Sequence, residues 1–181
     1  MLPNRLTTIG KYAFFNCSGF SDELNLTNCL PLKVIDDSAF SGCSGFDGEL
    51  KLPILMDKIN NGVFSGCIRL KGKLKLPPLL ESIGSCAFKD CVSFTGKLKL
   101  PVFLESIKSE AFKGCRGFCD ELELPEDLIS IDYGAFSGCS GLTGVLEIPQ
   151  NVSQIFQDTF ANCSGLSGDL KAANDVKIDR N

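Results

Sequence analysis

A regularly spaced Phe-x-x-Cys unit constrains the fold of this chain more than any other feature of its sequence. The unit begins at seven phenylalanines, which are Phe14, Phe40, Phe64, Phe88, Phe112, Phe136 and Phe160. The first step between them is 26 residues, and each of the next five steps is 24 residues. Self-similarity at a fixed period of this size is the signature of a repeat protein in which each copy forms one coil of a solenoid. The sequence therefore predicts seven stacked coils.

Other apolar positions follow the same register. The residue five before each phenylalanine is always isoleucine: Ile9, Ile35, Ile59, Ile83, Ile107, Ile131 and Ile155. The residue seven after each anchor cysteine of the unit is always leucine: Leu24, Leu50, Leu74, Leu98, Leu122, Leu146 and Leu170. Equivalent positions of successive coils should stack about 4.7–4.9 Å apart, the distance between neighbouring strands. Each apolar column then becomes a continuous wall of core that a single coil could not bury alone.

Small residues indicate where the backbone turns. Glycine, asparagine or aspartate stands directly before each anchor cysteine, and these residues tolerate a positive φ angle. We therefore interpret the Ala-Phe-x-Gly-Cys segment as a short helical turn that ends at this position. Glycine or aspartate also stands five residues after each anchor cysteine and predicts a corner before a short alternating strand, as in residues 49–53 and 121–125. Prolines then end most of these strands.

In this order the columns resemble the BspA-like branch of the leucine-rich repeat family, whose repeat reads Leu-x-x-Ile-x-x-x-Ala-Phe-x-x-Cys-x-x-Leu. Residues 83–94 match the pattern with Ile83, Ala87, Phe88, Cys91 and Phe94. The resemblance covers residues 3–172 and implies an α/β repeat fold. That fold is an open right-handed leucine-rich-repeat solenoid, with one parallel β-sheet face and short helical turns on the other side. The family also implies a surface adhesion or interaction protein without catalytic residues.

Composition excludes several function classes. The chain has no histidine, so it has neither a Ser/His/Asp or Cys/His nucleophile pair nor a histidine-ligated metal. Its net charge of −4 argues against general nucleic-acid binding. No apolar run approaches the roughly 18 residues that would suggest a membrane span. We therefore predict a protein that is not an enzyme, holds no metal or cofactor, and is not inserted into a membrane.

Ten cysteines raise the question of disulfides. Seven of them are the anchor cysteines of the repeat: Cys17, Cys43, Cys67, Cys91, Cys115, Cys139 and Cys163. Thiols stacked in a parallel column have poor geometry for disulfide formation. We therefore expect these cysteines to be reduced and buried, and to pack in the core as small apolar side chains. Outside this column we expect Cys86 and Cys119 to be comparatively exposed. A zinc site made from Cys86, Cys91, Cys115 and Cys119 is disfavoured because no CxxC spacing is present.

Lysines gather on the outward positions of the predicted strands, at the centre of an otherwise acidic protein. The candidate binding residues are Lys51, Lys71, Lys73, Lys75, Lys97 and Lys99. One interpretation is a binding surface for a carboxylate-rich protein or a sulfated glycan. The other is an ordinary solvated sheet face, with directly opposite residues paired across the edges of the patch. Those expected pairs are Lys73–Glu49, Lys97–Glu121 and Lys99–Glu123.

Two function classes remain open on the sequence. The first is a cell-surface or secreted module that binds protein or glycan, and the second is a cytosolic interaction scaffold, which the many thiols would suit. We treat residues 1–181 as one solenoid domain, uncapped at its N-terminal end, and expect a longer array or end-to-end self-association. Asn-x-Ser/Thr sites occur at Asn16, Asn25, Asn151 and Asn162, but the turn position alone already explains Asn16 and Asn162.

Overall fold

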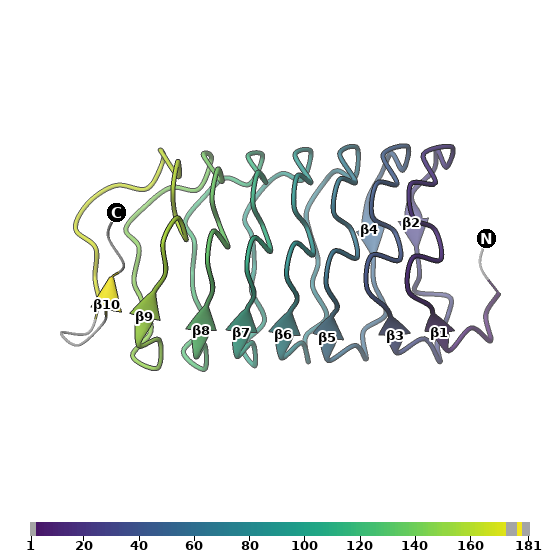
Figure 1. Cartoon of the computed structure of the whole chain (residues 1–181), viewed down its shortest axis with the longest axis horizontal. Coiled ribbons are helices and arrows are strands. Elements are labelled where there is room, and N and C mark those ends of the chain that lie inside the picture. Colours follow the sequence, from purple (N-terminus) through teal and green to yellow (C-terminus); the bar gives the residue numbers. More distant parts are fainter. Residues whose placement is uncertain (1–2, 173–176, 179–181) are drawn as a thin grey trace.

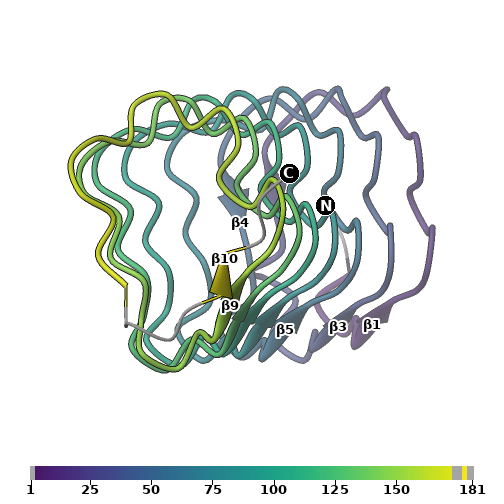
Figure 2. The ribbon, with the colours of Figure 1, turned by 60° about the vertical axis from the view of Figure 1, so that its left-hand side comes forward.

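The coils stack in a single row from one end of the molecule to the other (Figure 1). The computed structural model describes residues 3–172 and 177–178. Each coil repeats the path of the coil before it, and the ribbon in Figure 2 shows the coils stacked one behind another. Apolar side chains fill the space inside the coils as one continuous core. The predicted solenoid is confirmed.

The principal sheet is formed by the isoleucine column. Each coil contributes a two-residue strand that ends at its repeat isoleucine, and the strand bounds are β1 Thr8–Ile9, β3 Val34–Ile35, β5 Lys58–Ile59, β6 Ser82–Ile83, β7 Ser106–Ile107, β8 Ser130–Ile131 and β9 Gln154–Ile155. Strands β5 to β10 form a six-stranded sheet, and β1 and β3 form a separate pair. All of these pairings are parallel, with isoleucine opposite isoleucine from β5 to β9. Between β3 and β5 the side-chain amide of Asn60 donates to the Ile35 carbonyl at 2.8 Å.

The last strand of this sheet comes from a segment that departs from the repeat sequence. Strand β10, Lys177–Ile178, pairs in parallel with β9 and places Ile178 opposite Ile155. Two residues of the C-terminal tail therefore extend the sheet beyond the seventh repeat. The neighbouring positions 173–176 and 179–181 lie outside the described residues.

The segments that follow the glycine corners pair less extensively than the sequence suggested. Only β2, Leu24–Asn25, and β4, Leu50–Lys51, form a ladder there, and later coils contribute isolated bridges such as Lys99 to Glu123. The expectation of one parallel sheet on these segments is thus wrong, since the larger sheet lies on the isoleucine column. In the third to sixth coils each segment is confined between a corner with positive φ, such as Gly96 at 77°, and a proline without an N–H group. Few residues remain that can pair.

The predicted helical turns are not found among the described residues. The segment from Asp36 to Cys43 is instead a series of turns, in which the N–H groups of Ala39, Ser41 and Cys43 bond to carbonyls three residues earlier. The intervening N–H groups of Ser38, Phe40 and Gly42 bond to the next coil, so no run of helical bonds can form. Positive φ angles at Ser38 (55°) and Gly42 (73°) are also incompatible with a helix. The sequence indicated the second of these positions but not the first.

The repeat phenylalanines form a continuous stack of rings in the core. The Phe112 ring stacks on Phe88 and Phe136, with centroid distances of 5.4 and 5.5 Å, and meets Phe118 edge-on. Of the repeat leucines, only Leu170 in the last coil is exposed. Stacking of identical positions therefore buries each apolar column except at its ends.

Candidate binding site on the charged face

Outward side chains of the segments after the glycine corners form one charged surface, here called the charged face. Its members stand six and eight residues after each anchor cysteine and are Glu23, Asn25, Glu49, Lys51, Lys73, Lys75, Lys97, Lys99, Glu121, Glu123, Val145, Glu147, Asp169 and Lys171. In each coil the pair flanks the repeat leucine, which points inward: Leu74 is buried between Lys73 and Lys75. The alternation places every polar side chain of the pair on the solvent side.

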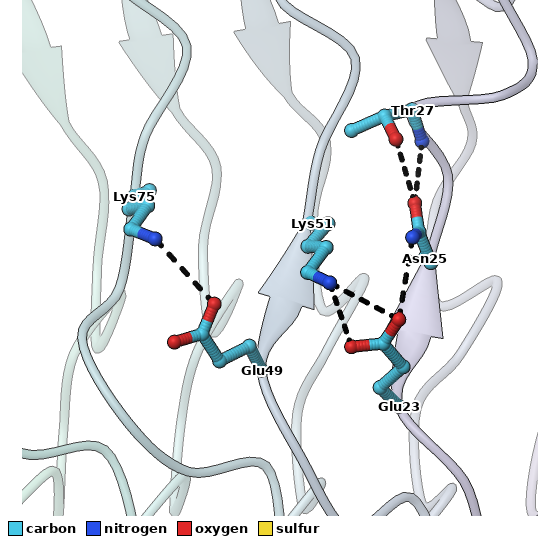
Figure 3. A network of polar contacts seen from close by, with 6 residues as sticks. All are labelled: Glu23, Asn25, Thr27, Glu49, Lys51 and Lys75. Carbon is cyan, nitrogen blue, oxygen red and sulfur yellow. Dashed lines mark hydrogen bonds and ion pairs between the residues drawn. The ribbon is translucent and has the colours of Figure 1, made fainter.

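Three of the four ion pairs on the charged face of the described chain run diagonally between coils, and the fourth, Lys171–Glu147, joins directly opposite residues. Glu23 pairs with Lys51 at 2.8 Å, and Glu49 pairs with Lys75 at 3.4 Å (Figure 3). Lys97 pairs with Glu123 at 2.5 Å in the same sense. Each of the three diagonal pairs joins the sixth position of one coil to the eighth position of the next coil. Strand side chains lean along the strand, which brings the tip of a long side chain to the diagonal neighbour.

The pairs expected from the sequence joined directly opposite residues and are wrong. Within the described part of the chain Glu49 engages Lys75 in place of Lys73, and Glu123 engages Lys97 in place of Lys99. These ion pairs shift the pKa values of the groups that form them. The Lys51 ammonium lowers the pKa of the Glu23 carboxyl through a hydrogen bond, and the Glu123 carboxylate raises the pKa of Lys97 in the same way.

At the centre of the face, the sixth position of one coil and the eighth position of the next coil are Lys73 and Lys99. Because both are cations, neither can neutralise the other, and neither has an ion-pair partner among residues 3–172 and 177–178. Both side chains line a shallow groove of about 420 Å³, together with Lys75, Lys97 and Asp120. Two ammonium groups there are free to bind an added anion.

The remaining lysines of the predicted patch are already neutralised. Lys71 pairs with Asp47 at 2.5 Å, and Arg69 contacts the same carboxylate, so both cations lower the pKa of Asp47. Lys51 and Lys75 are held by the glutamates described above. Of the six candidate lysines, Lys73 and Lys99 alone lack an ion pair within the described ranges. Sequence reasoning placed these two in the patch, but it could not separate them from the others because it assumed the wrong pairing direction.

An acidic groove lies beside this pair on the next coils. It has a volume of about 560 Å³ and is lined by Glu121, Glu123, Glu126 and Glu147 among other residues. Glu123 and Glu147 are held by Lys97 and Lys171. A ligand that binds the free lysines must therefore carry a localised negative charge, since a long polyanion would meet repulsion from these glutamates.

The cysteine column has a structural explanation. All ten cysteines are free thiols. In each coil after the first, the anchor thiol donates to the phenylalanine carbonyl of the preceding coil, as Cys91 does to Phe64 at 3.0 Å. Among the described residues no group of three or more histidine, cysteine, aspartate or glutamate side chains is arranged to hold a metal ion. The anchor cysteines therefore serve packing between coils.

The exposure of individual thiols differs in part from the prediction. Cys119 is exposed as predicted, but Cys86 is only partly exposed and its thiol lies 3.7 Å from a Glu110 carboxylate oxygen. Burial raises the pKa of Cys86. Cys17, in the first coil of the anchor column, is also partly exposed rather than buried.

Thiol labelling checks this assignment. With a disulfide reagent at about pH 8, Cys119 is expected to react first, because the thiolate is the reactive form and access is open. Cys43 and Cys163 should stay unreacted until the protein unfolds, since burial raises the pKa of each thiol to about 11. Mass spectrometry of partly labelled protein identifies the modified residue, and Cys119→Ser should remove the fast phase. Equally fast labelling of all ten thiols would contradict the packing described here.

No helix with the length and hydropathy of a membrane span occurs among the described residues. A comparison with curated proteins finds no match. Among solved structures, a leucine-rich repeat protein from Bacteroides ovatus is 30% identical, with a TM-score of 0.77 over 93% of this chain and 41% of that one. The T. pallidum leucine rich repeat protein is also 30% identical, with a TM-score of 0.68 over 80% of this chain and 64% of that one. This chain therefore spans less than two thirds of either protein.

A third solved structure, a leucine rich cell surface protein from Faecalibacterium prausnitzii, is 17% identical and has a TM-score of 0.33 over 99% of this chain and 81% of that one. The family model for the BspA type leucine rich repeat region matches six copies, over residues 1–96 and 33–167. This match agrees with the isoleucine, phenylalanine and cysteine columns that build the solenoid. The chain belongs to the BspA type leucine rich repeat family.

Proposed function

We propose that this chain is a non-catalytic binding module of a cell-surface or secreted protein, and that Lys73 and Lys99 hold an anionic group of its protein or glycan ligand. The observation that carries the proposal is the like-charged diagonal at the centre of the charged face. On three other diagonals of that face lysine and glutamate pair, whereas Lys73 and Lys99 form the one diagonal that is made of two cations. Two exposed ammonium groups beside a groove suit a carboxylate or a sulfate.

A cytosolic interaction scaffold is the second candidate. It is favoured by the ten free thiols, because structural thiols persist where the surroundings are reducing. The binding chemistry of Lys73 and Lys99 is the same in both cases. The two differ in where the full-length protein resides, which fractionation of the source cells with an antibody to this chain would decide.

Removing the two free lysines is expected to weaken anion binding about tenfold or more at low ionic strength, where exposed charges are least screened. The variant is Lys73→Ser/Lys99→Ser, and the probes are a short oligosaccharide with a single sulfate group and a short peptide with a single glutamate. The matched control is Lys51→Ser/Lys71→Ser, which removes the same charge from lysines that are already paired. The control should weaken binding less than about threefold.

Titration calorimetry at two salt concentrations measures both variants. Preference for the oligosaccharide or for the peptide separates a glycan ligand from a protein ligand. If both double variants weaken binding equally, net charge alone governs binding and the lysine pair is not a site. Undiminished binding by the Lys73→Ser/Lys99→Ser variant would also overturn the proposal.

A further inference from the structure

A second groove lies at the corner that each coil turns before it enters the principal sheet. We call it the corner groove. Its lining residues are Leu55, Asp57, Leu79, Glu81, Phe103, Glu105 and Asp127. The volume of the groove is about 490 Å³, and it shares no lining residue with the groove of Lys73 and Lys99. Successive coils contribute the same two positions, so the groove runs along the solenoid axis.

One wall of the corner groove is apolar, and its side chains lie outside the core. The side chains of Leu55, Leu79 and Phe103 are 56%, 49% and 53% exposed, while Leu80 and Leu104 next to them fill the core. In the other coils the equivalent position has no large apolar side chain, since it is Arg5, Pro31, Asp127 or Asn151.

Ile54 and Val102, which directly precede Leu55 and Phe103 in the chain, are each 68% exposed. Five large apolar side chains are therefore exposed on three successive coils, and three of them line one groove. Patches of this kind mark interaction surfaces.

The acidic lining residues, which stand two positions further along each coil, form an acidic wall that lacks neutralising partners. Asp57, Glu81 and Glu105 are exposed and stand in equivalent positions of three coils. None of them has an ion pair or a side-chain hydrogen bond within the described ranges, although Lys58 follows Asp57 in the chain. Like charges on neighbouring strands repel one another. A cationic partner would relieve that repulsion.

We propose that the corner groove docks a basic amphipathic α-helix of a partner protein. Charge complementarity selects lysine or arginine for the acidic wall, and the exposed patch selects leucine-like side chains for the other wall. The basic side chains and the leucine-like side chains can occupy adjacent faces of one helix. The proposal concerns a different surface from the anion site and does not depend on it.

The spacing of the coils favours a helix over an extended segment. Among the lining residues, Asp57, Glu81 and Glu105 directly precede strands β5, β6 and β7, which pair in parallel, so successive coils there lie about 4.8 Å apart. An α-helix rises about 5.4 Å per turn, so residues three or four apart meet successive coils. Side chains on one face of an extended strand recur at about 6.6–6.8 Å and fall out of step within three coils.

A synthetic peptide tests the proposal. The probe is a fluorescein-labelled helical peptide with leucines at a spacing of three and four residues and lysines on the adjacent face. Fluorescence anisotropy should show saturable binding to the whole chain. Glu81→Gln/Glu105→Gln and Leu79→Ser/Phe103→Ser should each weaken this binding about tenfold or more.

Two controls make the result specific. Glu121→Gln/Glu126→Gln removes the same charge from the acidic groove of the charged face and should change the affinity less than about threefold. Lys73→Ser/Lys99→Ser should leave peptide binding intact, so failure of the anion site and failure of the corner groove are distinguishable. A peptide of the same composition with a central proline, which breaks the helix, should bind about tenfold more weakly or worse.

Four outcomes would overturn the proposal. The first is the absence of saturable binding, and the second is equal weakening by the Glu121→Gln/Glu126→Gln control. The third is self-association of the chain alone that Leu79→Ser/Phe103→Ser abolishes in sedimentation velocity, since the occupant would then be a second copy of this chain. Equal binding of the proline peptide would reject the helix in favour of an extended segment.

Discussion

Replacing Phe112 with alanine is expected to destabilise the solenoid by about 4 kcal/mol. The Phe112 side chain is fully buried and stacks on the rings of the coils before and after it. Truncation therefore removes the transfer free energy of the ring and leaves a cavity that the neighbouring coils cannot fill without shifting their backbone ladders. Chemical denaturation followed by circular dichroism measures the change in the free energy of unfolding.

Two matched variants separate this effect from a general loss of aromatic surface. Phe103→Ala removes the same side chain from an exposed position and should change stability by no more than about 0.5 kcal/mol. Phe14→Ala lies in the first coil, where the ring stacks on only one repeat phenylalanine, Phe40. Its cost should fall between the other two, because solenoid stability is a sum over neighbouring coils. A Phe112→Ala cost as small as that of Phe103→Ala would show that the column is not the core of the fold.

Protonation of Glu110 is expected to remove about 2 kcal/mol of stability as the pH falls from near 4.5 toward 2. The Glu110 carboxylate accepts from Lys113 at 2.6 Å and from Lys89 at 2.7 Å, and its side chain is only 19% exposed. These lysines lower the pKa of Glu110 to about 2 from the usual 4.5. The full shift corresponds to about 3 kcal/mol, and solvent around the partly exposed lysines reduces the effect.

The sign follows from the direction of the shift. Because the pKa of Glu110 is lower in the folded state, its contribution is complete above pH 4.5 and is lost as the pH falls through the folded-state value of about 2. Glu110→Gln should therefore be less stable than the original chain at pH 7 and nearly equal to it near pH 2. Glu126→Gln, which removes an exposed carboxylate, is the control: its stability should follow that of the original chain across this pH range, because all other acids titrate alike in both proteins. A constant difference between the original chain and Glu110→Gln across this range would contradict the assignment.

The core residues were predictable from the sequence because apolar residues at the same position of every repeat must stack on one another. Residues such as Ile83, Phe88 and Cys91 recur in register, and one coil can bury them only against identical coils. The positive φ angle of Asn16, 57°, was likewise predictable, since glycine, asparagine and aspartate alone occupy that column. The column of Ser38, Cys86 and Glu110 also has positive φ, but its mixed composition concealed this.

The candidate sites depended on contacts between coils that a periodic sequence does not encode. Lys73, Lys75, Lys97 and Lys99 look equivalent in the sequence, and only the diagonal direction of the ion pairs leaves Lys73 and Lys99 free. That direction is set by how side chains lean along the strand, which is a property of the stacked backbone.

The sequence by itself determined the number of coils, the residues of the core and the turns before the anchor cysteines, because burial and φ preferences act at each repeat position separately. The tertiary structure decided that the principal sheet lies on the isoleucine column and that no helical turn follows it. There, alternate N–H groups such as those of Phe40 and Gly42 bond to the next coil. It also brought Leu79, Glu81 and Phe103 into the lining of one groove, since only stacking of the coils joins the side chains of separate repeats into one surface.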